Sequence, residues 1–108
     1  MKFVNLTPHD INDAESGKEF QPSGEIVRIS EENVLAKTVD GVNLYSTKYG
    51  ELAGLPEPAA GVIYIVSGQV LSYLRERTDR VDVISPGPLV RDTNGKPIGC
   101  KGFRTIVR

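Results

Sequence analysis

The sequence has little of what builds disulfide-bonded or metal-binding proteins. Among its 108 residues there are one cysteine, one histidine and no tryptophan. With Cys100 alone, no intramolecular disulfide can form, which predicts a reducing compartment and a buried structural thiol. His9 and Cys100 cannot supply the three or four ligands of a stable metal site, so we expect neither a metal nor a cofactor.

Long hydrophobic runs are also missing. The longest apolar run, 61–66, is far shorter than the roughly 20 residues that a membrane helix needs. The N-terminus turns polar too early, beyond Leu6, for the apolar core of a signal peptide. We therefore expect a protein that stays in the cytoplasm of a bacterial host cell and has no membrane partner.

The overall charge offers no general attraction to nucleic acid, because 13 basic and 14 acidic residues give a net charge of −1. The charge is nevertheless uneven along the chain. Residues 1–70 hold five Lys and Arg against ten Asp and Glu, or −5, and residues 71–108 hold eight against four, or +4. Folding either separates these halves into an acidic and a basic face or interleaves them, and both outcomes stay open.

Turn signals about every ten residues, with short segments rich in Val, Ile, Thr, Tyr and Phe between them, predict an α+β fold. We expect a mixed, mainly antiparallel β-sheet of short strands with one principal α-helix at about 68–77. The chain is predicted to form a single compact domain over residues 1–108, since a chain this short cannot build two cores.

Several local signals fix parts of this arrangement. Strands are expected at 2–6, 25–29, 34–39, 42–47, 63–66, 81–84, 89–91 and 98–103, with a loose hairpin over 11–20. The Asp40-Gly41 and Asn94-Gly95 pairs predict tight hairpin turns. The apolar run 63–66 predicts a central strand covered on both faces, which the helix links to a parallel strand. Pro97 belongs on an edge or at a bulge.

The group Thr7-Pro8-His9-Asp10 follows the first expected strand and gathers polar side chains. His9 has the only side chain that ordinarily titrates near neutral pH. One interpretation makes it a ligand contact or a general base oriented by Asp10. The other has Asp10 capping a turn, with His9 packed on the edge of that turn.

A second candidate lies where the apolar strand meets the helix. Ser67 is expected to cap the helix, and Gly68 and Gln69 leave backbone donors that favour an anion. Four arginines in the same half could add positive charge: Arg75, Arg77, Arg80 and Arg91. In the competing interpretation these arginines pair with nearby carboxylates, namely Glu76, Asp79, Asp82 and Asp92. No phosphate-loop or nucleophile-elbow motif occurs.

The segment 49–61 is rich in Gly and Pro and is predicted to be a long ordered loop. Tyr49, beside Gly50, is the best candidate for an exposed residue that stacks on a ligand or lies in an interface.

Several stretches of the chain resemble a family of small uncharacterised bacterial and bacteriophage proteins with an N-terminal Asn-Leu-Thr-Pro-His-Asp motif: 4–11, 49–51 with 54–56, 62–67, and 85–92 with 98–99. The resemblance covers nearly the whole chain in the same order. It implies one compact domain of bacterial or phage origin and a candidate surface of recurrent polar positions. Those positions are Asn5, Thr7, His9, Asp10, Tyr49, Glu51, Ser67, Arg91 and Asp92.

The leading hypothesis is a non-enzymatic, phage-encoded binding protein that takes a small anionic or nucleotide-like ligand, or a host protein. Its predicted ligand-binding residues are Thr7, His9, Asp10, Tyr49, Glu51, Ser67, Gln69 and Arg91. Two alternatives stay open. One is a small enzyme that uses His9 and Asp10 as an acid–base pair, and the other is an interaction module that forms a homo-oligomer.

Overall fold

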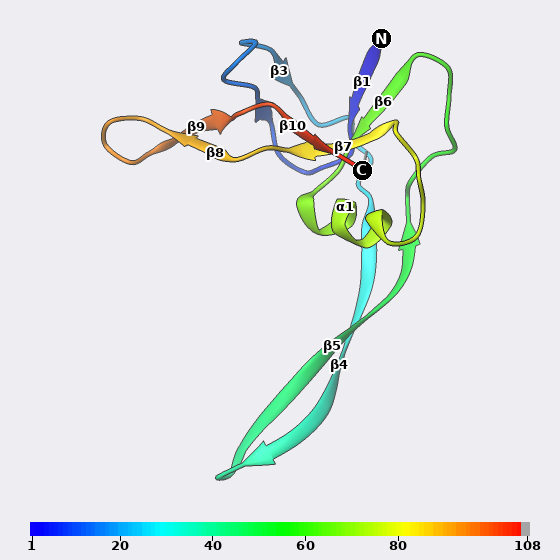
Figure 1. The fold of residues 1–108 in the computed structure, drawn as a ribbon, viewed down its shortest axis with the longest axis vertical. Coiled ribbons are helices and arrows are strands. Elements are labelled where there is room, and N and C mark those ends of the chain that lie inside the picture. Colours follow the sequence, from blue (N-terminus) through cyan, green and yellow to red (C-terminus); the bar gives the residue numbers. More distant parts are fainter. Residues whose placement is uncertain (107–108) are drawn as a thin grey trace.

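A four-stranded sheet forms the centre of the molecule in the computed structural model, which describes residues 1–106 (Figure 1). Its strands lie in the order β1 (Lys2–Asn5), β6 (Val62–Ile65), β7 (Val83–Pro86) and β10 (Phe103–Thr105). β6 runs parallel to both β1 and β7, and β10 runs antiparallel to β7. The carboxyl ends of three strands therefore meet at one edge of this sheet.

Helix α1 (Gly68–Arg75) joins β6 to β7 and covers one face of the sheet. Ser67 has an extended backbone, and its hydroxyl accepts a hydrogen bond from the Val70 amide at 3.3 Å. This cap satisfies one of the free donors of the first turn. The predicted cap and parallel crossover are confirmed, although the helix ends at Arg75 rather than at residue 77.

Strand β6 is buried on both faces, as its apolar run predicts. Tyr64 and Val66 lie in a cluster on the helix side, and Ile63 and Ile65 lie in a second cluster on the other side. The first cluster contains Leu6, Val27, Val70, Leu71, Leu74, Val83 and Ile106. The second contains Ile11, Ile84, Cys100, Phe20 and Phe103. Cys100 is thus a buried thiol, and burial raises its pKa.

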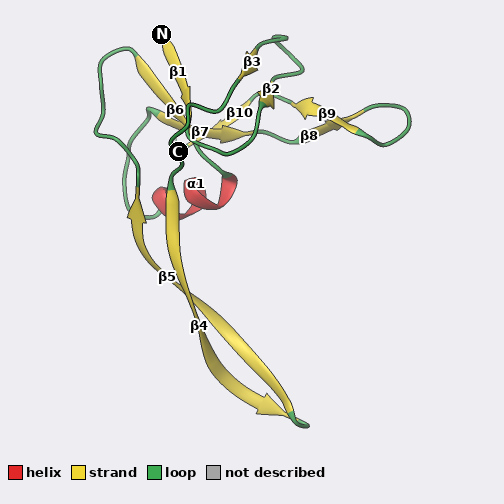
Figure 2. Cartoon of the chain, turned by 180° about the vertical axis from the view of Figure 1, so that it is seen from behind, coloured by secondary structure: helices red, strands yellow, loops and turns green. Residues whose placement is uncertain are grey.

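The longest elements are β4 (Arg28–Val39) and β5 (Val42–Ala53), which form a twisted two-stranded ribbon that projects from the rest of the chain (Figure 2). The turn between them has positive φ angles at Asp40 (50°) and Gly41 (80°), as a primed hairpin turn requires. The radius of gyration is 16.6 Å, above the roughly 13 Å of a compact chain of about 100 residues.

This ribbon corrects two predictions. Residues 28–39 form one continuous strand, and the predicted loop 49–61 is wrong over its first five residues, because Tyr49 lies inside β5. The pairing of β4 with β5 continues across two register shifts, which are typical of β-bulges. At the shift beside Ile29, a Cβ on Gly50 would collide with the Ser30 hydroxyl, so the glycine lets the two strands approach closely.

Two short hairpins lie on the other side of the sheet. β2 (Ile11–Asn12) pairs with β3 (Glu19–Phe20), as the loose hairpin predicted. β8 (Leu89–Arg91) pairs with β9 (Pro97–Cys100), and a register shift lies beside Pro97, where an edge or bulge was expected.

The single strand predicted over 98–103 is wrong. Gly102 has a φ of 60°, so the chain turns after β9 and resumes as β10. β10 then pairs with β7 instead of extending the hairpin.

The α+β class is confirmed in its broad form, with strands dominating. Most strand pairings are antiparallel, but in the described residues they are divided among four sheets, and the central sheet is mostly parallel. Within residues 1–106, no helix is long and apolar enough to cross a membrane.

One carboxylate fastens the N-terminal third to the C-terminal end. Asp13 Oδ1 accepts a hydrogen bond from the Gly102 amide at 3.0 Å, and Asp13 Oδ2 accepts one from the Ser16 hydroxyl at 2.6 Å. These bonds, that of Ser16 first, hold the pKa of Asp13 below its ordinary value.

Asp13 therefore contributes to the pH dependence of stability. Because its pKa is lower in the folded chain, it stabilises the fold above about pH 4, and this is lost as the pH falls through the lowered value. We expect Asp13→Asn to lower the Tm at pH 7 and to reduce the further fall in Tm between pH 7 and pH 3, measured by circular dichroism. Asp10→Asn, at an exposed carboxylate, is the control. Equal pH profiles for Asp13→Asn and wild type would contradict this role.

Candidate functional site

The N-terminal polar motif forms a closed internal network. Asn5 is 2% exposed, and its Oδ1 accepts hydrogen bonds from the Thr7 amide at 2.9 Å and the Thr7 hydroxyl at 2.7 Å. Its Nδ2 donates to the carbonyls of His9 at 2.8 Å and Phe20 at 3.0 Å. The polar atoms of Asn5 and Thr7 thus form hydrogen bonds that stabilise the turn after β1, and they are not available to a ligand.

The side chains of His9 and Asp10 are exposed, and no hydrogen bond or ion pair joins them in the described part of the chain. His9 enters the network through its backbone carbonyl and not through its imidazole. Asp10 lines a shallow cavity of about 330 Å³ beside β2 and β9 whose lining does not include His9. The proposed acid–base pair therefore gains no support from this geometry.

These contacts make the motif structural, and two variants test it. Asn5→Ala removes the partners of several buried groups and should cost about 2 to 3 kcal/mol in the free energy of unfolding. His9→Ala should leave the free energy of unfolding nearly unchanged, because its imidazole is exposed. Urea denaturation of both variants checks this, and a small cost for Asn5→Ala would disprove the structural role.

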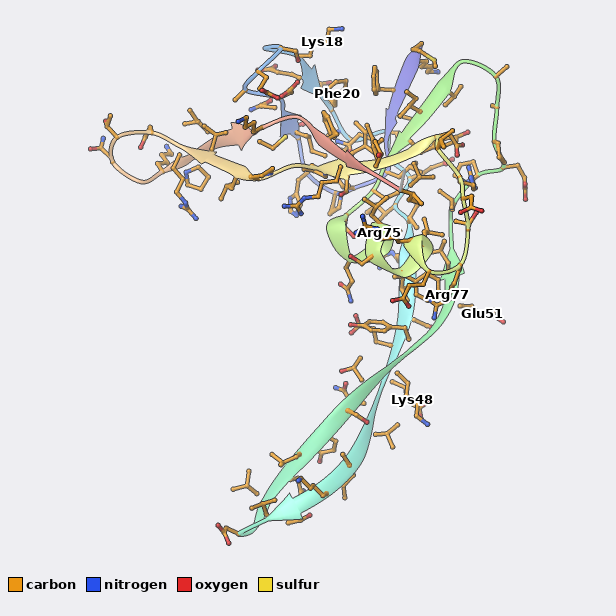
Figure 3. The ribbon with its side chains drawn as sticks, in the orientation of Figure 1. Lys18, Phe20, Lys48, Glu51, Arg75 and Arg77 are labelled. Carbon is orange, nitrogen blue, oxygen red and sulfur yellow. The ribbon has the colours of Figure 1, made fainter. Side chains whose placement is uncertain are left out.

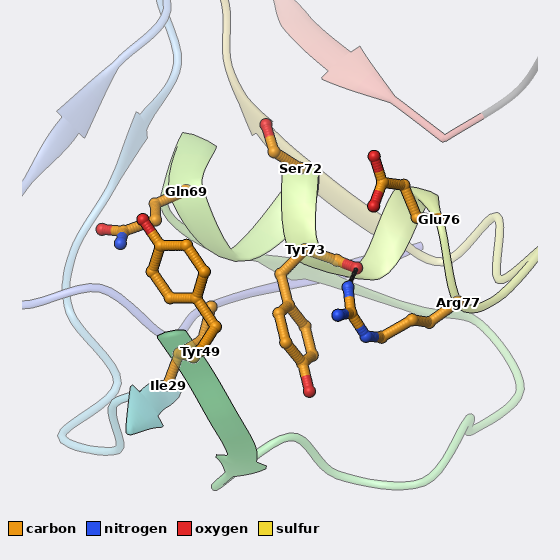
Figure 4. A pocket seen from close by; sticks show the side chains of 7 residues that line it. All are labelled: Ile29, Tyr49, Gln69, Ser72, Tyr73, Glu76 and Arg77. Carbon is orange, nitrogen blue, oxygen red and sulfur yellow. Dashed lines mark hydrogen bonds between the residues drawn. The ribbon is translucent and has the colours of Figure 1, made fainter. Parts of the chain in front are cut away.

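Tyr49 and Gln69 meet in a groove between the ribbon and the helix, with a volume of about 350 Å³ (Figure 4). The Tyr73 hydroxyl donates to the Gly50 carbonyl at 2.8 Å, and Gln69 Nε2 donates to the Glu31 carboxylate at 2.6 Å. The Arg77 guanidinium lies 3.8 Å from the Tyr73 ring centroid and donates to the Tyr73 carbonyl at 2.8 Å. Much of this groove is therefore formed by contacts that hold the ribbon against the helix.

Other predicted site residues are also bound within the chain. Arg80 makes a two-pronged ion pair with Asp82, with N···O distances of 3.0 and 2.7 Å, which raises the pKa of Arg80 and lowers that of Asp82. Arg91 donates to the Gly95 carbonyl at 2.8 Å. Asp92 accepts from two backbone amides of the same turn. Glu51 is exposed on β5 (Figure 3).

A second groove, which we call the arginine groove, lies between α1 and the β7–β10 side of the sheet. It has a volume of about 430 Å³. Its lining residues are Gly68, Leu71, Ser72, Arg75, Ser85, Arg104 and Thr105, and none of them is acidic. It therefore brings together two arginines from distant parts of the sequence with no carboxylate among its lining residues.

The spacing of the elements explains this arrangement. Gly68, Ser72 and Arg75 fall on one stripe of the helix, at intervals of four and three residues. Arg104 is the antiparallel partner of Ser85 across β10 and β7, and directly opposed residues point to the same face of a sheet. The side chains of Arg75 and Arg104 and the hydroxyls of Ser72 and Ser85 thus border one space.

Ser85 is the unusual member of the groove. It is fully buried, and its hydroxyl is the one buried side-chain polar atom with no hydrogen-bond partner in the described residues. A buried hydroxyl without a partner costs about 1 to 3 kcal/mol, so such a group calls for a physical reason. A polar ligand bound in the arginine groove would supply the missing hydrogen-bond partner.

Comparison with known proteins finds no matching family model, no similar curated protein and no similar solved structure. The resemblance to bacterial and phage proteins therefore stays a prediction. The candidate site depends on the geometry of this chain.

The sequence predicts an anion at the start of the helix with Arg75 nearby, but it does not indicate Ser85 or Arg104 as site residues. Ser85 stands in a Ser-Pro-Gly-Pro segment that indicates only the end of a strand. Arg104 lies opposite Ser85 because β10 pairs with β7, and no local sequence pattern predicts that pairing.

Proposed function

We propose that this protein binds a small oxyanion, of the phosphate or carboxylate class, in the arginine groove. The proposal depends on one observation: the buried Ser85 hydroxyl lacks a partner among the described residues, and it lines a groove with two arginines and no acidic side chain. A guanidinium group offers paired donors that match a phosphate or a carboxylate.

The size and position of the groove support a small ligand. Its volume of about 430 Å³ lies near the lower end of the roughly 300–1,000 Å³ of ligand pockets. Gly68 is the first residue of α1, where backbone amides and the helix dipole favour negative charge. This narrows the binding-protein hypothesis to one groove. None of the eight ligand-binding residues predicted from the sequence lines it: Thr7, His9, Asp10, Tyr49, Glu51, Ser67, Gln69 and Arg91.

Titration calorimetry with inorganic phosphate and with nucleoside monophosphates tests this proposal. We expect saturable binding that weakens as the salt concentration rises, and roughly tenfold or weaker binding in Arg104→Ala. Arg91→Ala is the matched control, since Arg91 is exposed and lies outside the groove. Flat traces for every oxyanion, or equal losses in the two variants, would refute the site.

Ser85→Ala gives an independent test, because it separates stability from binding. Removing a buried hydroxyl that has no partner should raise the free energy of unfolding by about 1 kcal/mol in the absence of ligand. The same substitution should weaken oxyanion binding, since the ligand loses a donor. A variant that is less stable than wild type would mean that the hydroxyl serves the fold.

A further inference from the structure

The distal part of the β4–β5 ribbon, residues 30–50, which we call the arm, leaves both of its outer strand edges open. Its side chains are largely exposed, and neither outer edge of the arm pairs with another strand in the described residues. It exposes six large apolar side chains, each by 41% to 60%: Leu35, Val39, Val42, Leu44, Tyr45 and Tyr49. A lone two-stranded ribbon is only marginally stable in water, and unpaired strand edges readily accept another strand.

The sign of the charge argues against nucleic acid as this partner. The arm holds two lysines, Lys37 and Lys48, against three acidic residues, Glu31, Glu32 and Asp40. It has no basic excess to attract phosphates.

The order of charges along β4 instead complements itself. Glu32, Val34 and Lys37 share one face, because they lie opposite the alternating residues Lys48, Ser46 and Leu44 of β5. A register shift at Ala36 keeps Lys37 on that face. If two copies of β4 pair antiparallel about Val34, Asn33 falls opposite Leu35 of the second copy, and Glu32 falls opposite its Lys37. Two reciprocal ion pairs would then flank a contact between the two Val34 side chains.

The same register gives the tip of the arm a place to dock. It brings Asp40 of the second copy to the level of Ile29, near the base of β4. A cavity of about 250 Å³ lies there, lined by Arg28, Ser67, Gln69 and neighbouring residues. Arg28 carries a charge opposite to that of the incoming Asp40, and the Glu31 carboxylate, which has the same sign as Asp40 and also lines the cavity, accepts a hydrogen bond from Gln69 Nε2.

We propose that the arm pairs edge to edge, through β4, with the arm of a second copy of this chain. The dimer has a four-stranded sheet with two copies of β4 at its centre. Such an interface is isologous, so each contact occurs twice.

A charge exchange tests the register. Sedimentation velocity should show a dimer for the wild type. Glu32→Lys or Lys37→Glu alone should weaken dimerisation roughly tenfold or more, since each puts like charges opposite each other twice. The double variant Glu32→Lys/Lys37→Glu should dimerise as the wild type does. An equimolar mixture of the two single variants should form heterodimers, because each supplies the charge that the other lacks.

A disulfide test locates the contact. Val34→Cys should form a disulfide-linked dimer under mild oxidation, because the two Val34 positions face each other at the two-fold axis. Ser46→Cys is the matched control, since Ser46 lies opposite Val34 on β5 and would be separated from its copy by the two central strands. The native Cys100 is buried and does not compete.

Several results would overturn the proposal. They are a monomeric wild type at all concentrations, a dimer insensitive to both single charge variants, no rescue in the double variant or the mixture, and crosslinking through Ser46→Cys in place of Val34→Cys. Circular dichroism of each variant establishes that it is folded. The arm and the arginine groove share no lining residue, so failure of one proposal leaves the other standing.

Discussion

The burial of β6 on both faces is the constraint on which the rest of the structure depends. Ile65, the last residue of β6, and Val66, which follows it, are both 0% exposed, although they belong to the clusters on opposite sides of the sheet. A strand with two apolar faces requires two covering layers. Helix α1 and the base of the ribbon supply one layer, and the short hairpins supply the other, where Phe20 of β3 packs against two phenylalanines of the central sheet. Phe20 lies at the centre of that second layer, 5.1 Å from Phe3 and 5.6 Å from Phe103 between ring centroids.

Features set by near neighbours could be predicted from the sequence. The Asp40-Gly41 turn, the Ser67 cap and the buried strand 63–66 each follow from residues adjacent in the chain. Features set by distant pairing could not. Gly50 next to Tyr49 is typical of a loop, and it lies in a strand because β5 pairs with the distant residues of β4.

The candidate site shows the same division between local and distant information. Asn5 and Thr7 have the composition of a binding motif, but their polar groups hydrogen-bond to each other and to nearby carbonyls. A sequence does not distinguish a side chain whose hydrogen bonds complete a turn from one that is available to bind a ligand. Ser85, in contrast, belongs to no recognisable sequence motif. It becomes a candidate site residue because its buried hydroxyl has no hydrogen-bond partner among the described residues.

The chain order of the pairings also sets the order of folding during synthesis. Val39 pairs with Val42, whereas Lys2 pairs with Val62 and Thr105 with Ile84, so the ribbon closes locally and the central sheet needs both ends of the chain. A hairpin forms in about 1–10 μs, but a ribosome adds only about 5–20 residues per second. The ribbon can therefore close seconds before its anchoring sheet exists.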